Sequence, residues 1–443
     1  MNMASKLLIY IIISVIYIYP FCIRYFGFPE LPPLATQMMI LFLFVETYFT
    51  SFLNNKSFIS TDRKIRKYLL YIILFLLTTF ITAFINYNNV ILVIKSLLEF
   101  GLIGLLLFLA IIEIDLSEKN QEQILKFIYS LLVLQIPVTA FQYFIMGYRD
   151  PDSISGTISS TEVGGTGIVA FLMSFLIAYG ISQILIKGLS LVRILMVVSS
   201  FIPALLGGAR IGLILLPLTI LINVISFFIF YRSDKIKKIT KAILVSAIVT
   251  VVISVLITEV VPNLKDSKYL SLDQINTTEK FENYDKGAGR YSRLQGYNLL
   301  FKGIFKNNLN IFLGMGNQAI TKSSTANVET ANLDFVNYMP DALMFLASNG
   351  IVGLLLIISI ILIGIPSLKS YLKIESLRFF EILALSLIPV TLNIIFSLFY
   401  TSTWNSQIGF TYWIILAILF HRFSIIQRGN GLMKSLADSK SLE

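Results

Sequence analysis

Apolar runs of roughly 20 residues recur along the whole chain, and they constrain its fold more than any other feature. A run of this length matches the hydrocarbon core of a bilayer, which is about 30 Å thick. Such a run can cross lipid only as a helix, because an open strand edge would leave its backbone groups without hydrogen-bond partners. The ten-residue alternation that is typical of barrel strands is absent from the sequence. The sequence therefore predicts an all-α polytopic membrane protein.

These runs predict about twelve transmembrane helices within a single membrane domain, residues 1–443. The first run has no small-residue cleavage site, so we expect a retained helix rather than a signal peptide. The predicted spans are residues 7–23, 35–53, 68–86, 90–112, 124–146, 164–186, 190–206, 211–230, 242–261, 341–365, 379–400 and 408–425.

The distribution of charge predicts the orientation. Only 14% of the residues are charged, whereas a soluble domain carries about a quarter. A net charge of +10 could indicate nucleic-acid binding, but most Lys and Arg lie in short loops that the span count places on one side. The positive-inside rule assigns that side, with both termini, to the cytoplasm. No nucleic-acid partner is therefore expected. The basic clusters lie within residues 56–67, 187–193, 232–241, 369–378 and 422–434.

The longest segment between predicted spans is the polar stretch 262–340, which the same count places on the outer face. Within it, apolar residues recur at three and four positions from Leu294 through Tyr297 and Phe301 to Ile304. This spacing predicts an amphipathic helix that lies on the membrane surface or packs against the bundle. We expect this loop to carry the chemistry of the protein.

The rare residue types limit that chemistry. Cys22 is the only cysteine and His421 the only histidine, and His421 falls near the end of the last predicted span. No intrachain disulfide can form, and neither a thiolate cluster nor a histidine metal site is expected. We predict that the protein uses no metal and no cofactor.

Arg210 is the ionisable residue least expected at its position. It lies in Leu205-Leu-Gly-Gly-Ala-Arg-Ile-Gly212, between two apolar runs that leave almost no room for a loop. The glycines permit a tight, close-packed turn or a broken helix. An arginine at a helix start, beside free backbone N–H groups, favours an anion site. The alternative is an arginine that extends to the outer interface and only anchors the helix.

Arg290 and Arg293 form the second candidate, in Gly287-Ala-Gly-Arg-Tyr-Ser-Arg293 just before the predicted amphipathic helix. Three residues apart at a helix start, they project from one face. Two guanidinium groups there suit a diphosphate, which presents its oxygens in planar forks. The alternative is a solvated surface pair.

Asp341 is the third candidate, at the point where the large loop re-enters the membrane after Pro340. A carboxylate at a helix start is stabilised by the helix dipole, so simple capping is one interpretation. The functional alternative is a catalytic base or a hydrogen-bond partner of the acceptor sugar, and the neighbouring Asn337 and Tyr338 are candidate sugar contacts.

Other charged residues are weaker candidates. Lys95 and Glu99 are four residues apart within a predicted span, which favours a structural ion pair that faces the bundle interior. The remaining weak candidates are Arg24, Glu46, Glu162 and the turn Arg149–Asp152.

The order of several short motifs resembles the O-antigen polymerase and O-antigen ligase superfamily of bacterial envelopes. The matching elements are Gly208-Ala-Arg-Ile-Gly212, Gly289-Arg290, Phe312-Leu-Gly-Met-Gly316 and Asn349-Gly-Ile-Val-Gly353. They cover roughly the second half of the chain, and the first half matches only in hydropathy. The resemblance implies a fold related to the C-type glycosyltransferases and a substrate carried on undecaprenyl pyrophosphate. The ligase branch places a histidine where this chain has Met339, which favours the polymerase branch.

The resemblance thus implies a polymerase of lipid-linked repeat units in the bacterial inner membrane, with residues 262–340 as a periplasmic loop. Arg210, Arg290 and Arg293 are expected to bind the pyrophosphate, and Asp341 to accept the proton of the acceptor hydroxyl. The expected partners are undecaprenyl-pyrophosphate-linked glycans, membrane lipids and a chain-length regulator. The alternatives are a ligase that transfers glycan to lipid A core and a flippase of lipid-linked oligosaccharide, which would need short loops and a charged central cavity.

Overall fold

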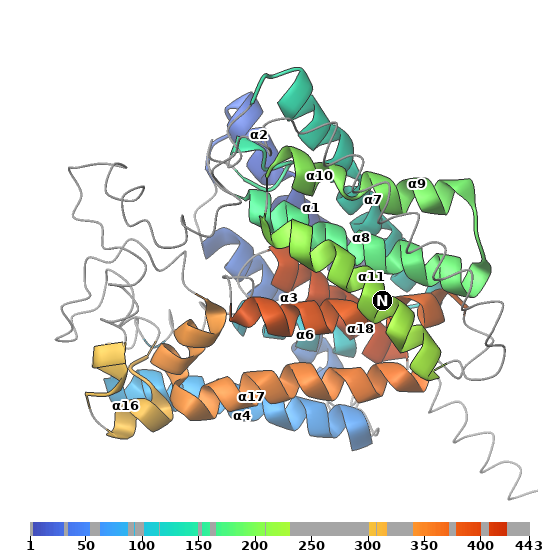
Figure 1. The fold of residues 1–443 in the computed structure, drawn as a ribbon. Coiled ribbons are helices and arrows are strands. Elements are labelled where there is room, and N and C mark those ends of the chain that lie inside the picture. Colours follow the sequence, from blue (N-terminus) through green and yellow to red (C-terminus); the bar gives the residue numbers. More distant parts are fainter. Residues whose placement is uncertain are drawn as a thin grey trace, which may run out of the picture.

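The structure is a computed structural model in which every long element of the described part of the chain is an α-helix, and no strand occurs there. The helices form one bundle, and most of them run roughly parallel or antiparallel to one another (Figure 1). The predicted all-α class is confirmed. The described residues are 3–30, 34–53, 63–86, 93, 102–114, 116–148, 153–159, 165–208, 210–230, 301–306, 308–316, 340–371, 378–399 and 407–422.

Six helices in this part of the chain are long and apolar enough to cross a membrane, and each coincides with a predicted span. They are α3 (Leu34–Leu53), α4 (Arg63–Asn86), α7 (Glu118–Phe144), α8 (Thr166–Lys187), α17 (Asp341–Tyr371) and α18 (Arg378–Leu398). Three further predicted spans contain α6 (Leu102–Glu113), α11 (Arg210–Phe230) and a helix over residues 407–422. The membrane-type architecture is confirmed, whereas the count of twelve stays a prediction. The predicted span 242–261 lies outside the described residues.

Two predicted spans are broken rather than continuous. The first consists of α1 (Met3–Tyr17) and α2 (Tyr19–Phe26), which are bent by 48°. Pro20 lies at the start of α2, where its ring excludes the normal bond to the carbonyl of Ile16. The Gln407 side chain donates to that carbonyl instead, at 3.5 Å. The span 190–206 likewise divides into α9 (Leu191–Ser199) and α10 (Ile202–Leu206).

The centre of the bundle is formed by α8 and α18, most of whose residues are buried. Helix α11 packs on both of them, and α17 packs on α18 and α4. Small residues allow the helices to approach closely, as is common where lipid removes the hydrophobic drive for association. A Cβ added at Gly180 of α8 would lie 2.6 Å from Cγ2 of Val197 in α9, and one at Gly104 of α6 would lie 2.7 Å from Cδ1 of Trp413.

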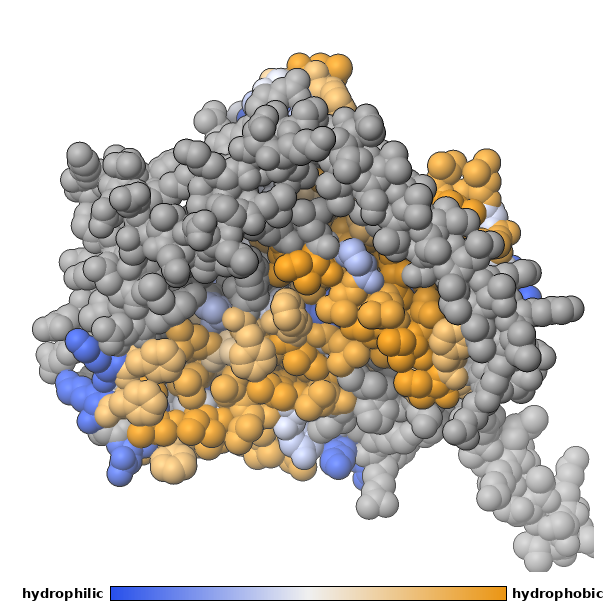
Figure 2. All heavy atoms as spheres, in the orientation of Figure 1, coloured by the Kyte–Doolittle hydropathy of each residue, from blue (hydrophilic) through white to orange (hydrophobic). Residues whose placement is uncertain are grey.

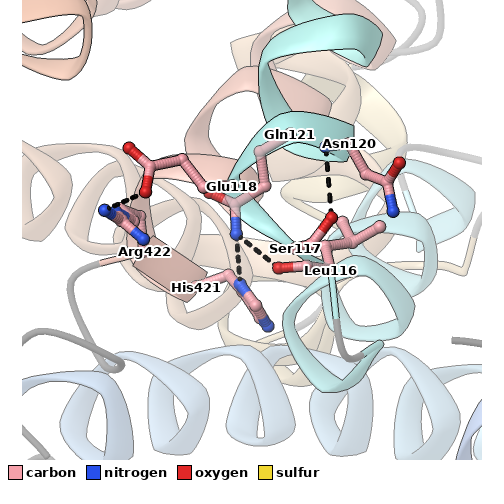
Figure 3. A network of polar contacts seen from close by, with 7 residues as sticks. All are labelled: Leu116, Ser117, Glu118, Asn120, Gln121, His421 and Arg422. Atoms are coloured by element: carbon pink, nitrogen blue, oxygen red, sulfur yellow. Dashed lines mark hydrogen bonds and ion pairs between the residues drawn. The ribbon is translucent and has the colours of Figure 1, made fainter. Parts of the chain in front are cut away.

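One end of the bundle carries residues from both ends of the chain, and we call it the termini end. Lys6 Nζ in α1 donates to Asn120 Oδ1 near the start of α7, at 2.8 Å. At the end of the last helix, Arg422 pairs with Glu118 at 2.7 Å and His421 contacts Gln121 at 3.0 Å (Figure 3). The two ends of the described chain therefore lie on the same side, as the span count requires.

The opposite end carries the start of α17 and α16 (Asn308–Leu313), and we call it the loop end (Figure 1). The large loop is described here only in part. Residues 301–304 are helical and continue the predicted amphipathic pattern, with Phe301 exposed and Ile304 buried, while residues 291–300 lie outside the described part. The exposed rings of Phe301 and Phe305 stack with centroids 6.1 Å apart.

A broad hydrophobic surface covers the region of α17 and α11, and hydrophilic residues gather beside α16 (Figure 2). Exposed apolar side chains such as Leu77 and Phe84 of α4, Leu355 of α17 and Ile214 of α11 are 49–69% accessible. Exposure of this extent over several bilayer-length helices is expected where lipid replaces water as the solvent.

Candidate functional site

Arg210 is the first residue of α11, and α10 ends only a few residues earlier, at Leu206. Gly208, between the two helices, takes a positive φ of 60°, which glycine adopts without steric cost. A Cβ added at Gly207 would overlap the methyl group of Thr166 in α8. The predicted tight, close-packed turn before Arg210 is therefore confirmed.

The first turn of α11 is fixed against two neighbouring helices. A Cβ added at Gly212 would lie 2.7 Å from the Cβ of Ala204 in α10 and 2.9 Å from the Cβ of Ala170 in α8. Any larger side chain at Gly212 would push these helices apart. The position of the Arg210 backbone is thus set by helix packing.

Residues 153–159 form a buried loop beside this turn. Ile154, Ser155, Gly156 and Thr157 are all buried, and the Thr166 hydroxyl donates to the carbonyl of Ile154 at 2.9 Å. A buried loop must find partners for its backbone groups, because each unpaired group costs about 1–3 kcal/mol. The loop therefore depends on polar side chains from the surrounding helices.

Two glutamines of α7 supply those partners. Gln142 accepts from the N–H of Gly156 and donates to its carbonyl, both at 2.9 Å. Gln135 accepts from the N–H of Thr157 at 2.9 Å and donates to its hydroxyl at 2.7 Å. The two glutamines are two helical turns apart and so lie on one face of α7. Together they supply hydrogen-bond partners to the loop backbone at Gly156 and Thr157, as the backbone of a neighbouring strand would.

Arg24 holds the same loop from α2. Its Nη1 donates to Ser155 Oγ at 2.8 Å, and its Nη2 donates to the carbonyl of Ser153 at 3.3 Å. The guanidinium carbon lies 5.2 Å from the ring centroid of Tyr25 and 5.1 Å from that of Tyr148, within the range of a cation–π interaction. Arg24 thus has a structural role, which links α2 to the loop beside the Arg210 turn.

Asp341 opens α17 and is only 2% exposed. The helix continues to Asn349 and is then interrupted, because Gly350 takes φ 65° and ψ −170°. Helix α17 coincides with the predicted span 341–365, and the structure adds a break in the half of that span nearest the loop end. A break of this kind inside a membrane leaves backbone groups that need other partners.

The missing partners come from the segment that follows α16. The N–H of Met315 donates to the carbonyl of Ala347 at 2.7 Å, and the N–H of Gly316 donates to the carbonyl of Ser348 at 3.0 Å. A Cβ at Gly314 would overlap Ser348, so glycine is needed for the approach. The motifs Phe312–Gly316 and Asn349–Gly353 therefore form one junction, which we call the loop–helix clasp.

Polar residues of α4 complete the loop–helix clasp. Asn349 Nδ2 donates to Thr79 Oγ1 at 2.6 Å, and Thr82 Oγ1 donates to the carbonyl of Leu313 at 2.7 Å. The next polar residue along this face of α4, Asn86, donates to the carbonyl of Gly314 at 3.5 Å. Sequence reasoning missed this face, although polar residues at spacings of three and four within an apolar run were a usable signal.

The starts of α11 and α17 lie at the same end of the bundle. Both helices pack on α18, and Asn393 near the end of α18 donates to Thr219 of α11 at 2.6 Å. In Figure 1, α11 and α17 both run from the loop end toward the termini end, and Gly212 in the first turn of α11 packs on Ala170 near the start of α8. Arg210 and Asp341 each open a helix at the loop end.

The other predicted site residues, Arg290, Arg293, Asn337 and Tyr338, lie outside the described residues, as does the predicted pair Lys95–Glu99. Sequence reasoning also missed Gln135 and Gln142. They are amides within a long apolar helix, and such residues are usually there to satisfy a buried partner.

Comparison with known proteins adds no family to this description. No protein-family model matches the chain, and no curated protein matches it. What the fold and the site define is a class: an all-helical protein with apolar helices of bilayer length, in which buried polar side chains hold a broken helix and a buried loop.

Proposed function

We propose that this protein is a glycosyltransferase of the bacterial inner membrane that polymerises undecaprenyl-pyrophosphate-linked repeat units into O-antigen or a related surface polysaccharide. The observation that supports this most is the loop–helix clasp. It anchors residues 312–316 of the large polar loop inside the bundle, at the same end as Arg210 and Asp341. Two lipid-linked sugars that react at a membrane surface need such a fixed element above the bundle to hold them in line.

The proposed reaction needs few protein groups. A hydroxyl group of the acceptor repeat attacks the anomeric carbon of the donor glycan, and the bond from that carbon to the pyrophosphate oxygen breaks. Arg210, Arg290 and Arg293 stabilise the charge on the departing pyrophosphate. Asp341 accepts the hydroxyl proton, and Asn337 and Tyr338 contact the acceptor sugar. Arg290 and Arg293 precede Phe301, where the described part of the loop begins, by eleven and eight residues.

The orientation belongs to the same proposal. Basic residues such as Arg66, Lys119, Lys187 and Arg378 belong to helix ends at the termini end, which the positive-inside rule assigns to the cytoplasm. The loop end then faces the periplasm, where surface polysaccharide is assembled. The filled centre formed by α8 and α18 favours a transferase over a flippase, which needs a central cavity.

The test uses the purified full chain with two synthetic lipid-linked repeat units, and the product length is read by mass spectrometry. We expect the wild type to elongate the glycan and Arg210→Lys to lose at least tenfold in rate, because an ammonium group lacks the bidentate fork. Arg193→Lys, at the termini end, is the matched control and should be fully active. Transfer only to lipid A core would instead indicate a ligase, and transbilayer movement without transfer would indicate a flippase.

A further inference from the structure

A groove of about 210 Å³ lies between α7, α8, α9 and α18, in the half of the bundle toward the termini end. Its α7 wall carries Lys126, Tyr129 and Val133, at spacings of three and four residues on one helical face. Lys126 and Val133 are exposed, whereas Tyr129 is buried and forms the floor. The groove therefore opens on the surface of the bundle that faces lipid.

The remaining walls are apolar or aromatic. Tyr179 of α8 stacks on Tyr129 with ring centroids 4.3 Å apart, and Met196 of α9 and Phe379 of α18 close the groove on the other sides. Phe379 is the second residue of α18, and Met196 lies in the second turn of α9. The groove thus extends from the membrane interface at the termini end into the depth of one leaflet.

Basic residues lie at the ends of the helices that line the groove. Lys187 at the end of α8, Arg193 in the first turn of α9 and Arg378 at the start of α18 belong to the same helices that line it. Lys126 reaches the same region from the wall, with a side chain that is 68% exposed. Glu122 lies 3.3 Å from Lys126, but an exposed pair of this kind is weak, and the ammonium group keeps further donors for a second partner.

We propose that this groove binds one anionic membrane phospholipid, with an acyl chain along the apolar walls and the phosphate group beside Lys126. An apolar slot that runs into a leaflet fits a hydrocarbon chain, and Lys126 on its wall, with further basic residues at the ends of the lining helices, fits an anionic headgroup. Long basic side chains at helix ends extend toward the headgroup layer while their stems stay on apolar surface. The site is separate from the loop end, and it does not depend on the proposed reaction.

The test is native mass spectrometry of the purified full chain, supplied with phosphatidylglycerol or with phosphatidylcholine of the same acyl chains. We expect the wild type to retain one phosphatidylglycerol in preference to phosphatidylcholine. Lys126→Ala should lower phosphatidylglycerol retention about fivefold, the effect of one basic residue near a membrane surface. Val133→Trp should lower retention of either lipid, because the indole fills the slot without changing the charge.

Lys119→Ala is the matched control, since Lys119 is exposed in the first turn of the same helix but does not line the groove. It should retain lipid as the wild type does. Equal retention of the two lipids by the wild type would overturn the proposed headgroup recognition. Undiminished retention by Val133→Trp would show that lipid does not occupy the groove, and the proposal would then fail. The thermal stability of each variant without added lipid shows whether its fold is intact.

Discussion

Gly350 lies directly against the carbonyl group of Phe312, so closely that a Cβ at Gly350 would overlap the carbonyl oxygen and carbon. The two residues are separated by the end of the large loop and by the first turns of α17. Their contact places loop backbone inside a broken membrane helix, and it makes the loop–helix clasp the element of the loop end most sensitive to substitution.

Gly350→Ala should destabilise the protein more than a positive φ alone would explain. Alanine with a positive φ and an extended ψ, as at Gly350, costs about 1–3 kcal/mol, and displacement of the Phe312 backbone adds about 1–3 kcal/mol. Gly188→Ala is the matched control, because Gly188 has a similar backbone, φ 88° and ψ 176°, with no other atom within 4 Å of an added Cβ. Thermal unfolding in detergent should therefore rank the wild type first, Gly188→Ala second and Gly350→Ala last. Equal losses of stability in the two variants would mean that displacing the Phe312 backbone costs no free energy.

Gln142→Leu should destabilise the protein by about 2–4 kcal/mol, because the N–H and the carbonyl of Gly156 would both lose a buried partner. Gln123 provides the control on the same helix, since it is exposed and its bond from Lys6 is exposed as well. Gln123→Leu should change stability by less than about 0.5 kcal/mol. Unfolding monitored in detergent distinguishes the two, and similar midpoints would show that the 153–159 loop does not need its glutamines.

Asn349 and Thr79 should be energetically coupled. A double-mutant cycle with Asn349→Ala and Thr79→Val is expected to give a coupling of about 0.6 kcal/mol, a usual value for a hydrogen bond between membrane helices. The neighbouring Thr78 donates within its own helix, to the carbonyl of Leu74. A cycle that pairs Asn349→Ala with Thr78→Val should therefore give no coupling. Equal coupling in both cycles would contradict the specific contact.

Single cysteines should report opposite sides of the membrane at the two ends of the bundle. In a Cys22→Ser background, Lys302→Cys marks the loop end and Lys119→Cys the termini end, and both positions are exposed. A membrane-impermeant maleimide added to intact spheroplasts should label only position 302. Position 119 should be labelled once the cells are lysed. The reverse pattern would overturn the proposed orientation.

Asp341→Asn should insert and fold normally but polymerise about 10²-fold more slowly, if the carboxylate accepts the acceptor proton as proposed. Asparagine has nearly the same shape and caps a helix start as well as aspartate does, so a capping role would leave activity largely intact. The rate with synthetic lipid-linked repeats distinguishes the two roles. Near-normal turnover would remove Asp341 from the reaction.

Hydropathy predicted the helices well, because the requirement for internal hydrogen bonds leaves an apolar run of bilayer length few alternatives. The tight turn before Arg210 was also predictable, since the three nearby glycines lack side chains and so permit two apolar runs to pack closely. The break at Gly350 was not. It depends on backbone groups of Met315 and Gly316 that approach from another part of the chain, and no local pattern contains that information.

The buried loop at residues 153–159 was missed for a similar reason. Apart from Ile154 and Ile158, its residues are small and polar, which is typical of an exposed turn, and the partners of its buried backbone are Gln135, Gln142 and Arg24 from two other helices. The same contacts changed the interpretation of Arg24 from a weak functional candidate to a structural residue. Side chains that satisfy a distant backbone can be recognised as unusual in sequence, but their partners cannot.

The polar face of α4 also has a consequence for the order in which the protein is synthesised. Thr82 meets its partner, Leu313, only after a further 231 residues have been made. Thr79 also waits for a distant partner, Asn349, but its hydroxyl group donates to the carbonyl of Phe75, one turn earlier in the same helix. The oxygen of Thr79 is then still free to accept from Asn349 when α17 arrives. Helix α4 can therefore enter the bilayer early with the Thr79 hydroxyl proton already satisfied, while ribosomes complete the second half of the chain.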